Sequence, residues 1–172
     1  MKKAWIVVLV LLSSLMITSK VFAQTHKIPY TEADYARLHA VIQYVENVLK
    51  YGHEYNEETK LLPDAINTLT GEPARWTFPN RAEVPYANLA NQQNFFRTLV
   101  ALSNVTGSPK YKNEAVAMLD EFMDKYQSPN GLFQWGGHRA INLDTLEVQS
   151  FEGPNGPHEL KNMMPYYELM LE

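Results

Sequence analysis

The stretch NLANQQNFFRTLVALSNVTGSPKYKNEAVAMLDEFMDKY, residues 88–126, decides the fold class of this chain. Apolar residues recur in it at spacings of three and four, the period of an amphipathic helix, on both sides of a Gly- and Pro-containing turn. The pattern predicts one helix over 88–103 and a second from about 109 to 126. The methionine and aromatic residues of the second helix fit a core-facing stripe.

Another helix is predicted upstream of this pair. Thr31 is a suitable N-cap, and Glu32 and Asp34 place negative charge in the first turn. Apolar residues then follow at helical spacing as far as Leu49, and Gly52 is the predicted stop. The sequence therefore predicts three helices before residue 127.

A long, weakly periodic segment, 53–87, separates the first helix from the pair. It contains Asp64, Asn67, Arg75 and Trp76, a mixture of polar and aromatic side chains that suits contact with carbohydrate. The alternative is a surface excursion that covers the end of a helix.

The expected fold class is all-α, an incomplete α/α toroid of antiparallel helix pairs with a small β-hairpin excursion. The hairpin is predicted from segments 140–143 and 146–149, which flank Asp144 and Thr145. The last residues, 165–172, have the pattern of an apolar helix that opens without a stop signal. Residues 24–172 are therefore expected to be the N-terminal part of a toroid, truncated at its C-terminus.

Residues 1–23 have the features of an export signal. Lys2 and Lys3 precede a nearly unbroken apolar run, and small residues allow cleavage after Ala23. A membrane anchor is the alternative, but the run is short beside the about 20 apolar residues of a spanning helix. The protein is expected to be exported, periplasmic or secreted, with no stable membrane span after cleavage.

Charge and composition exclude several classes of function. Loss of Lys2, Lys3 and Lys20 with the signal takes the formal charge from −4 to −7, which disfavours nucleic acid as a partner. The chain has no cysteine, so it has neither disulfides nor thiolate metal ligands. A metal would need imidazole and oxygen ligands.

Two Gly- and Pro-flanked blocks near the C-terminus hold the candidate site residues. His138 and Glu159 are candidate ligands of a divalent metal such as Mn, Co or Zn if the intervening hairpin folds back. The alternative is a hydrogen-bonded histidine and a solvated or capping glutamate. Trp135 offers a stacking wall for a sugar, and Arg139 and Lys161 could pair with carboxylates. A core tryptophan and an ordinary ion pair are the alternatives there.

Four blocks of the chain, 88–94, 131–138, 158–161 and 165–170, resemble the pectate lyases of polysaccharide lyase family two. The resemblance covers most of residues 24–172 but only the N-terminal part of such an enzyme. It implies an α/α toroid that cleaves polygalacturonate, an acidic polysaccharide, or its oligogalacturonides by β-elimination.

The resemblance also implies a divalent metal, most often manganese (Co, Ni, Zn or Mg are possible), held by two histidines and a glutamate, with an arginine as base. His138 and Glu159 match the metal-ligand positions. The arginine and the second histidine are expected beyond Glu172, so no catalytic residue is assigned and the 172-residue chain alone is expected to be inactive.

Two other classes of function stay open. One is a non-catalytic carbohydrate-binding module or remnant toroid, which would bind polygalacturonate without turnover. The other is a glycoside hydrolase on the same fold, which would need two carboxylates such as Asp64 and Glu159 flanking the scissile bond.

Overall fold

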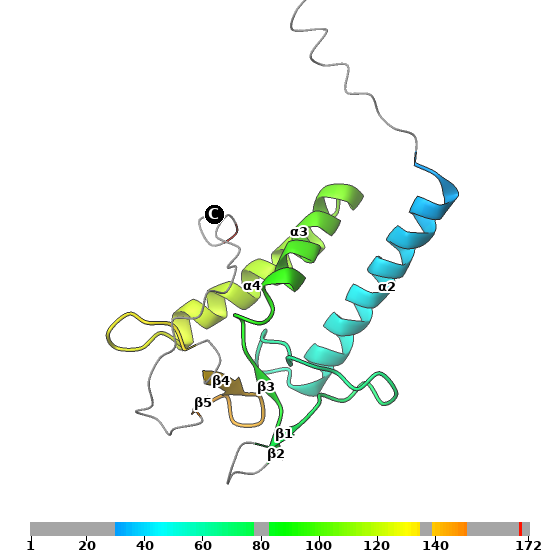
Figure 1. The fold of residues 1–172 in the computed structure, drawn as a ribbon. Helices are drawn as coiled ribbons and strands as arrows, with labels where there is room; N and C mark the ends of the chain where they lie inside the picture. Colours follow the sequence, from blue (N-terminus) through cyan, green and yellow to red (C-terminus); the bar gives the residue numbers. More distant parts are fainter. Residues whose placement is uncertain (1–29, 78–82, 135–138, 151–168, 170–172) are drawn as a thin grey trace, which may run out of the picture. The chain divides into compact units, whose positions relative to one another are not determined.

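The computed structural model describes residues 30–77, 83–134, 139–150 and 169 (Figure 1). The chain divides into two compact units, Met1–Leu38 and His39–Glu172. Helix α2 (Glu32–Tyr55) begins in the first unit and continues in the second. The predicted site residues Trp135, His138, Glu159 and Lys161 lie outside the described residues.

The start of α2 confirms the predicted cap. Thr31 Oγ1 accepts a hydrogen bond from the backbone N–H of Asp34 at 3.2 Å, and the Asp34 carboxylate accepts one from the N–H of Thr31 at 2.9 Å. This reciprocal pair satisfies two donors at the helix N-terminus. The Thr31 hydrogen bonds lower the pKa of the Asp34 carboxyl.

The prediction that Gly52 stops the helix is wrong, since α2 continues to Tyr55. Gly52 is buried, and a β-carbon built on it would lie 2.5 Å from Cδ2 of Leu62. Glycine is therefore required for the close approach of Leu62 to the helix, not for a helix end.

Helices α3 (Gln93–Thr106) and α4 (Lys110–Lys125) form the predicted pair and pack against each other (Figure 1). Gly107 between them has φ +74° and donates its N–H to the carbonyl of Ser103, a left-handed cap that ends α3. The pair buries Phe96 and Leu99 from α3 and Met118 and Phe122 from α4. Burial of these side chains is the main stabilising contribution of the pair.

The start of α3 differs from the prediction, because the helix begins at Gln93 and not near residue 88. Residues 88–92 form a turn in which the N–H of Asn91 donates to the carbonyl of Asn88 and the N–H of Gln92 to that of Leu89. We call residues 88–92 the amide turn.

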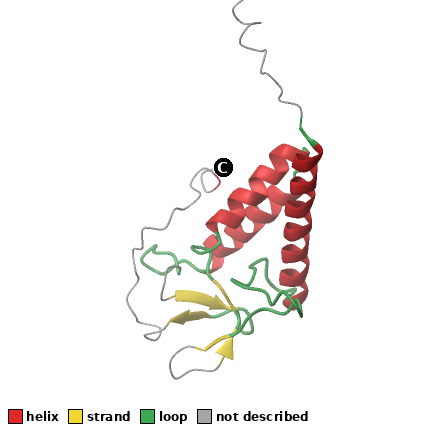
Figure 2. Cartoon of the chain, turned by 45° about the vertical axis from the view of Figure 1, so that its right-hand side comes forward, coloured by secondary structure: helices red, strands yellow, loops and turns green. Residues whose placement is uncertain are grey.

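In the part of the chain that the structure describes, the strands are short and form two antiparallel sheets, and loops make up most of the segment between α2 and α3 (Figure 2). Strand β1 (Trp76–Thr77) pairs with β2 (Glu83–Val84). Strand β3 (Tyr86–Ala87) pairs with β4 (Arg139–Asn142), and β4 pairs with β5 (Val148–Ser150). The β4–β5 pair lies where the hairpin was predicted.

The toroid stays a prediction, because the described ranges contain helices and two small sheets but no closed arrangement of helix pairs that would test it. Within the same ranges, no helix combines the length and the apolar character needed to cross a bilayer.

Replacing Phe96 by alanine should lower the free energy of unfolding by about 3–5 kcal/mol, because the ring is fully buried between α3 and α4. Urea denaturation followed by circular dichroism measures the loss. Val105→Ala on the same helix is the matched control, since Val105 is 56% exposed and its removal should cost less than about 0.5 kcal/mol. Equal losses for the two variants would contradict the packing described here.

Candidate functional site

Of the residues predicted to hold the metal or pair with the uronate, Arg139 is the one that the described ranges contain, and it begins β4. Its Nη1 donates to Oε1 of Gln134 at 2.6 Å, and its carbonyl oxygen accepts from Nδ2 of Asn88 at 3.1 Å. The side chain is half-buried. Its role toward a substrate carboxylate stays a prediction, but its backbone is held by Asn88.

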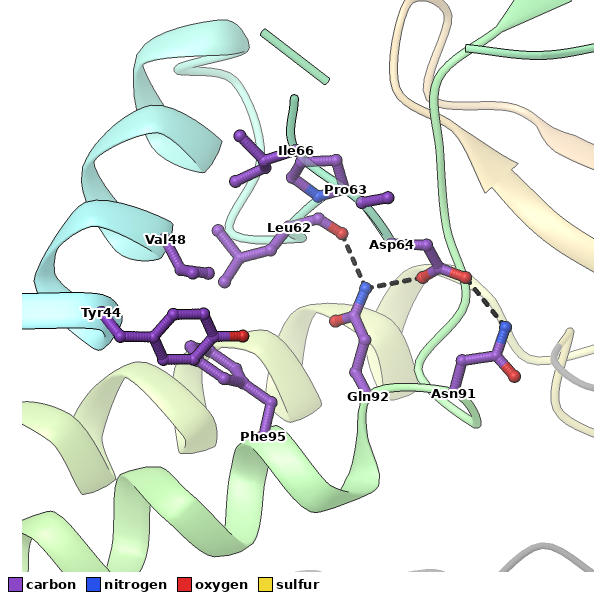
Figure 3. Close-up of a pocket in the computed structure, with 10 residues that line it drawn as sticks. Tyr44, Val48, Leu62, Pro63, Asp64, Ile66, Asn91, Gln92 and Phe95 are labelled. Carbon is purple, nitrogen blue, oxygen red and sulfur yellow. Dashed lines mark hydrogen bonds between the residues drawn. The ribbon is translucent and has the colours of Figure 1, made fainter. Parts of the chain in front are cut away.

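The Asp64 carboxylate is the centre of a polar cluster that reaches Arg139 through Asn88. Its Oδ1 accepts from the backbone N–H of Asn88 at 2.7 Å and from Nε2 of Gln92 at 2.8 Å, and its Oδ2 accepts from Nδ2 of Asn91 at 2.9 Å (Figure 3). All three donors belong to the amide turn. One carboxylate therefore fixes the backbone that leads into α3.

Burial raises the pKa of Asp64 and outweighs its hydrogen bonds to Asn91, Asn88 and Gln92, which act in the opposite direction. No cation is among these partners, so within the described ranges the charge is compensated by amide dipoles.

Gln92 is held in one orientation. Its side-chain nitrogen donates both to the carbonyl of Leu62 at 2.8 Å and to Asp64, and only an NH₂ group can make both bonds. Its Oε1 is consequently turned the other way, is buried, and has no hydrogen-bond partner among the described atoms. A buried acceptor left unpaired costs about 1–3 kcal/mol.

A pocket of about 280 Å³ adjoins this cluster, with Asp64, Asn91 and Gln92 on one side. The rings of Tyr44 and Phe95 lie on the other side (Figure 3). The two rings meet edge to face, with centroids 6.4 Å apart and planes at 83°. The pocket thus has a polar wall and an aromatic wall, a common arrangement in small-molecule sites.

Arg75, one of the residues in 53–87 expected to suit carbohydrate contact, makes hydrogen bonds within the protein instead. Its guanidinium donates to Oδ2 of Asp144 at 3.1 Å and to the hydroxyl of Tyr55 at 2.9 Å. Trp76 remains 47% exposed and its ring lies 6.1 Å from that of Tyr86. Arg75 therefore joins the end of α2 to the β4–β5 turn, whereas Trp76 is available for stacking.

Three or more His, Cys, Asp or Glu side chains placed to hold a metal do not occur together in the described ranges. His138 and Glu159 are outside those ranges, so the metal site stays a prediction.

Comparison with known proteins identifies relatives of the chain. The sequence profile of a family described as periplasmic pectate lyase matches residues 59–172. A pectate disaccharide-lyase of Dickeya dadantii (strain 3937) is 40% identical over 134 residues, which cover 77% of this chain and 25% of that protein. The chain thus spans about a quarter of the length of this curated relative.

The raised pKa of Asp64 predicts an unusual dependence of stability on pH. The native state holds the proton more tightly than the unfolded chain, so ionisation of Asp64 costs stability as the pH rises from the unfolded pKa through the folded one. The stability advantage of the wild type over Asp64→Asn should therefore shrink across that interval. Urea denaturation at a series of pH values measures it.

Asp34→Asn is the matched comparison, because the pKa of Asp34 is lowered and the sign reverses. The wild type should lose its advantage over that variant as the pH falls through the folded pKa of Asp34. The same slope for both variants would show that Asp64 is not desolvated.

Proposed function

The chain belongs to the periplasmic pectate lyase family, and on that basis we propose that the protein is an exported lyase that cleaves pectate by β-elimination. The family match over residues 59–172 carries the proposal. Because the relative is named a pectate disaccharide-lyase, unsaturated digalacturonate is the product to look for first.

His138 and Glu159 are proposed to hold a divalent cation, with manganese foremost and Co, Ni, Zn or Mg as alternatives. An imidazole nitrogen suits Co, Ni and Zn, a carboxylate oxygen suits Mn and Mg, and residues 1–172 contain no cysteine that could supply a thiolate. When bound, the cation stabilises the negative charge that develops on the uronate carboxylate as C5 loses its proton.

The chain's other residues are proposed to bind and orient the sugar. Trp135 would stack on a pyranose ring, while Arg139 and Lys161 would pair with uronate carboxylates. The hydrogen bond from Asn88 to the Arg139 carbonyl supports such a role, because it fixes the backbone from which this arginine projects. No residue in 1–172 is proposed as the base.

Export is proposed to depend on residues 1–23, with cleavage before Gln24. The family description as periplasmic supports an exported protein. The acidic polysaccharide would then be met outside the cytoplasm.

A chimera tests the function of this part of the enzyme. Residues 24–172 replace the matching quarter of the Dickeya dadantii relative, and formation of unsaturated oligogalacturonides from polygalacturonate is followed by ultraviolet absorbance. We expect lyase activity that a chelator abolishes and that added Mn²⁺ restores. His138→Ala should reduce its rate at least about tenfold, since loss of a metal ligand should cost no less than loss of a supporting outer-shell group.

His39→Ala is the control for the chimera, because His39 is an exposed histidine on α2. Its rate should stay within twofold of the unsubstituted chimera, on the order of what an exposed substitution changes. A chimera that folds but releases only saturated products would instead favour a hydrolase. One that binds polygalacturonate without any cleavage would favour a binding module.

A further inference from the structure

The pocket beside Asp64 continues into a second one. The second pocket, also about 280 Å³, shares Tyr44, Val48 and Ile66 with the first and extends along residues 67–71. We call the two together the α2 groove. Each lobe is near the lower end of the about 300–1,000 Å³ typical of ligand pockets, so each has room for one sugar-sized group.

Aromatic side chains line both lobes of the α2 groove. Tyr44 and Phe95 bound the first lobe, and Tyr51 borders the second. Tyr44 is 59% exposed, so much of its side chain remains accessible to a ligand. Gly71 presses against the Tyr51 ring, where a β-carbon would lie 2.8 Å from Cδ1, and this contact fixes the ring at the end of the groove.

The polar lining of the α2 groove includes four side-chain amides beside Asp64, Thr68 and Thr70. Asn91 and Gln92 line the first lobe with Asp64, and Asn47 and Asn67 line the second. Oε1 of Gln92 is buried and has no hydrogen-bond donor among the described atoms. It lies on the side of Tyr44 and Phe95 (Figure 3). Side-chain amides can both donate to and accept from the hydroxyl groups of a sugar, and the neighbouring aromatic rings offer a surface on which the sugar ring can stack.

The charge of the α2 groove indicates that its ligand differs from the uronate substrate. Asp64 is the single charged residue among the lining residues that the structure describes, and none of these is Lys, Arg or His. A galacturonate carboxylate would meet a carboxylate and no cation, at a cost that the low dielectric of a pocket increases. The groove therefore disfavours acidic sugars.

We propose that the α2 groove is a binding site for uncharged sugar units, separate from the residues proposed for pectate cleavage. The choice of a sugar as ligand rests on the proposed function, because a polysaccharide lyase meets carbohydrate, whereas the selection against charge rests on the lining alone. A polysaccharide with both uronate and neutral units would engage the protein at two places.

Two probes that differ only at C6 test this site: methyl α-galactopyranoside and the corresponding methyl galacturonide. Binding to the full chain is followed by ¹H–¹⁵N NMR at the side-chain amide of Gln92 and the backbone of Val48 and Ile66. The galactoside should shift these signals in a saturable way, and the galacturonide should bind at least about tenfold more weakly, as one unfavourable charge contact predicts.

Tyr44→Ala removes an exposed stacking ring and should weaken galactoside binding about tenfold. Tyr35→Ala is the matched control: Tyr35 is a similarly exposed tyrosine of α2, at 56%, and does not line the groove, so affinity should not change. Equal affinity for the two probes, no shift at Gln92 with the galactoside, or unchanged affinity in Tyr44→Ala would each overturn the proposal. Pectate cleavage is scored separately in the chimera, so a failure of the neutral-sugar site is distinguishable from a failure of the proposed lyase activity.

Discussion

The constraint on which the structure depends is the need to satisfy one half-buried carboxylate with no cation among its hydrogen-bond partners in the described residues. Asp64 meets it with donors from the amide turn, and the geometry of that turn follows from their positions. The turn in turn sets where α3 begins, and through Asn88 it holds the first residue of β4. The hydrogen bonds of Asp64 and the amide turn therefore position the start of α3, the first residue of β4 and the polar wall of the pocket.

Periodicity predicted those parts of the fold in which local sequence and packing agree. The helix expected from about 109 to 126 is α4, Lys110–Lys125, because an apolar stripe and a proline-containing turn point to the same boundaries. Gly52 and Asn88 were misassigned for one physical reason: each serves a contact with a residue distant in sequence. The close approach of Leu62 requires a glycine at position 52. The hydrogen bonds of Asp64 hold residues 88–92 in a turn, so these residues do not join the helix.

The candidate site was less predictable than the helices. The sequence places Asp64 in a polar loop and offers it as a possible hydrolase carboxylate. Its three donors lie 24 to 28 positions away and are uncharged amides, so no charge pattern in the sequence indicates the cluster. The one usable signal was the density of Asn and Gln just before a helix, where such side chains compete with helical hydrogen bonds. Arg75 shows the converse, since a cation in a loop suggested ligand binding and proved to pair with Asp144.

The pairing of β3 with β4 joins two segments that lie far apart in the sequence, which bears on the order in which the chain can fold. Helices α3 and α4 are adjacent in sequence, so they can associate at little entropic cost as soon as both have been made, whereas Tyr86 and Ala87 must wait for Asn142 and Ile141. Until then one edge of β3 stays unpaired, and an open strand edge invites pairing with other chains. In an exported protein that emerges N-terminus first, this interval is when aggregation competes most strongly with folding.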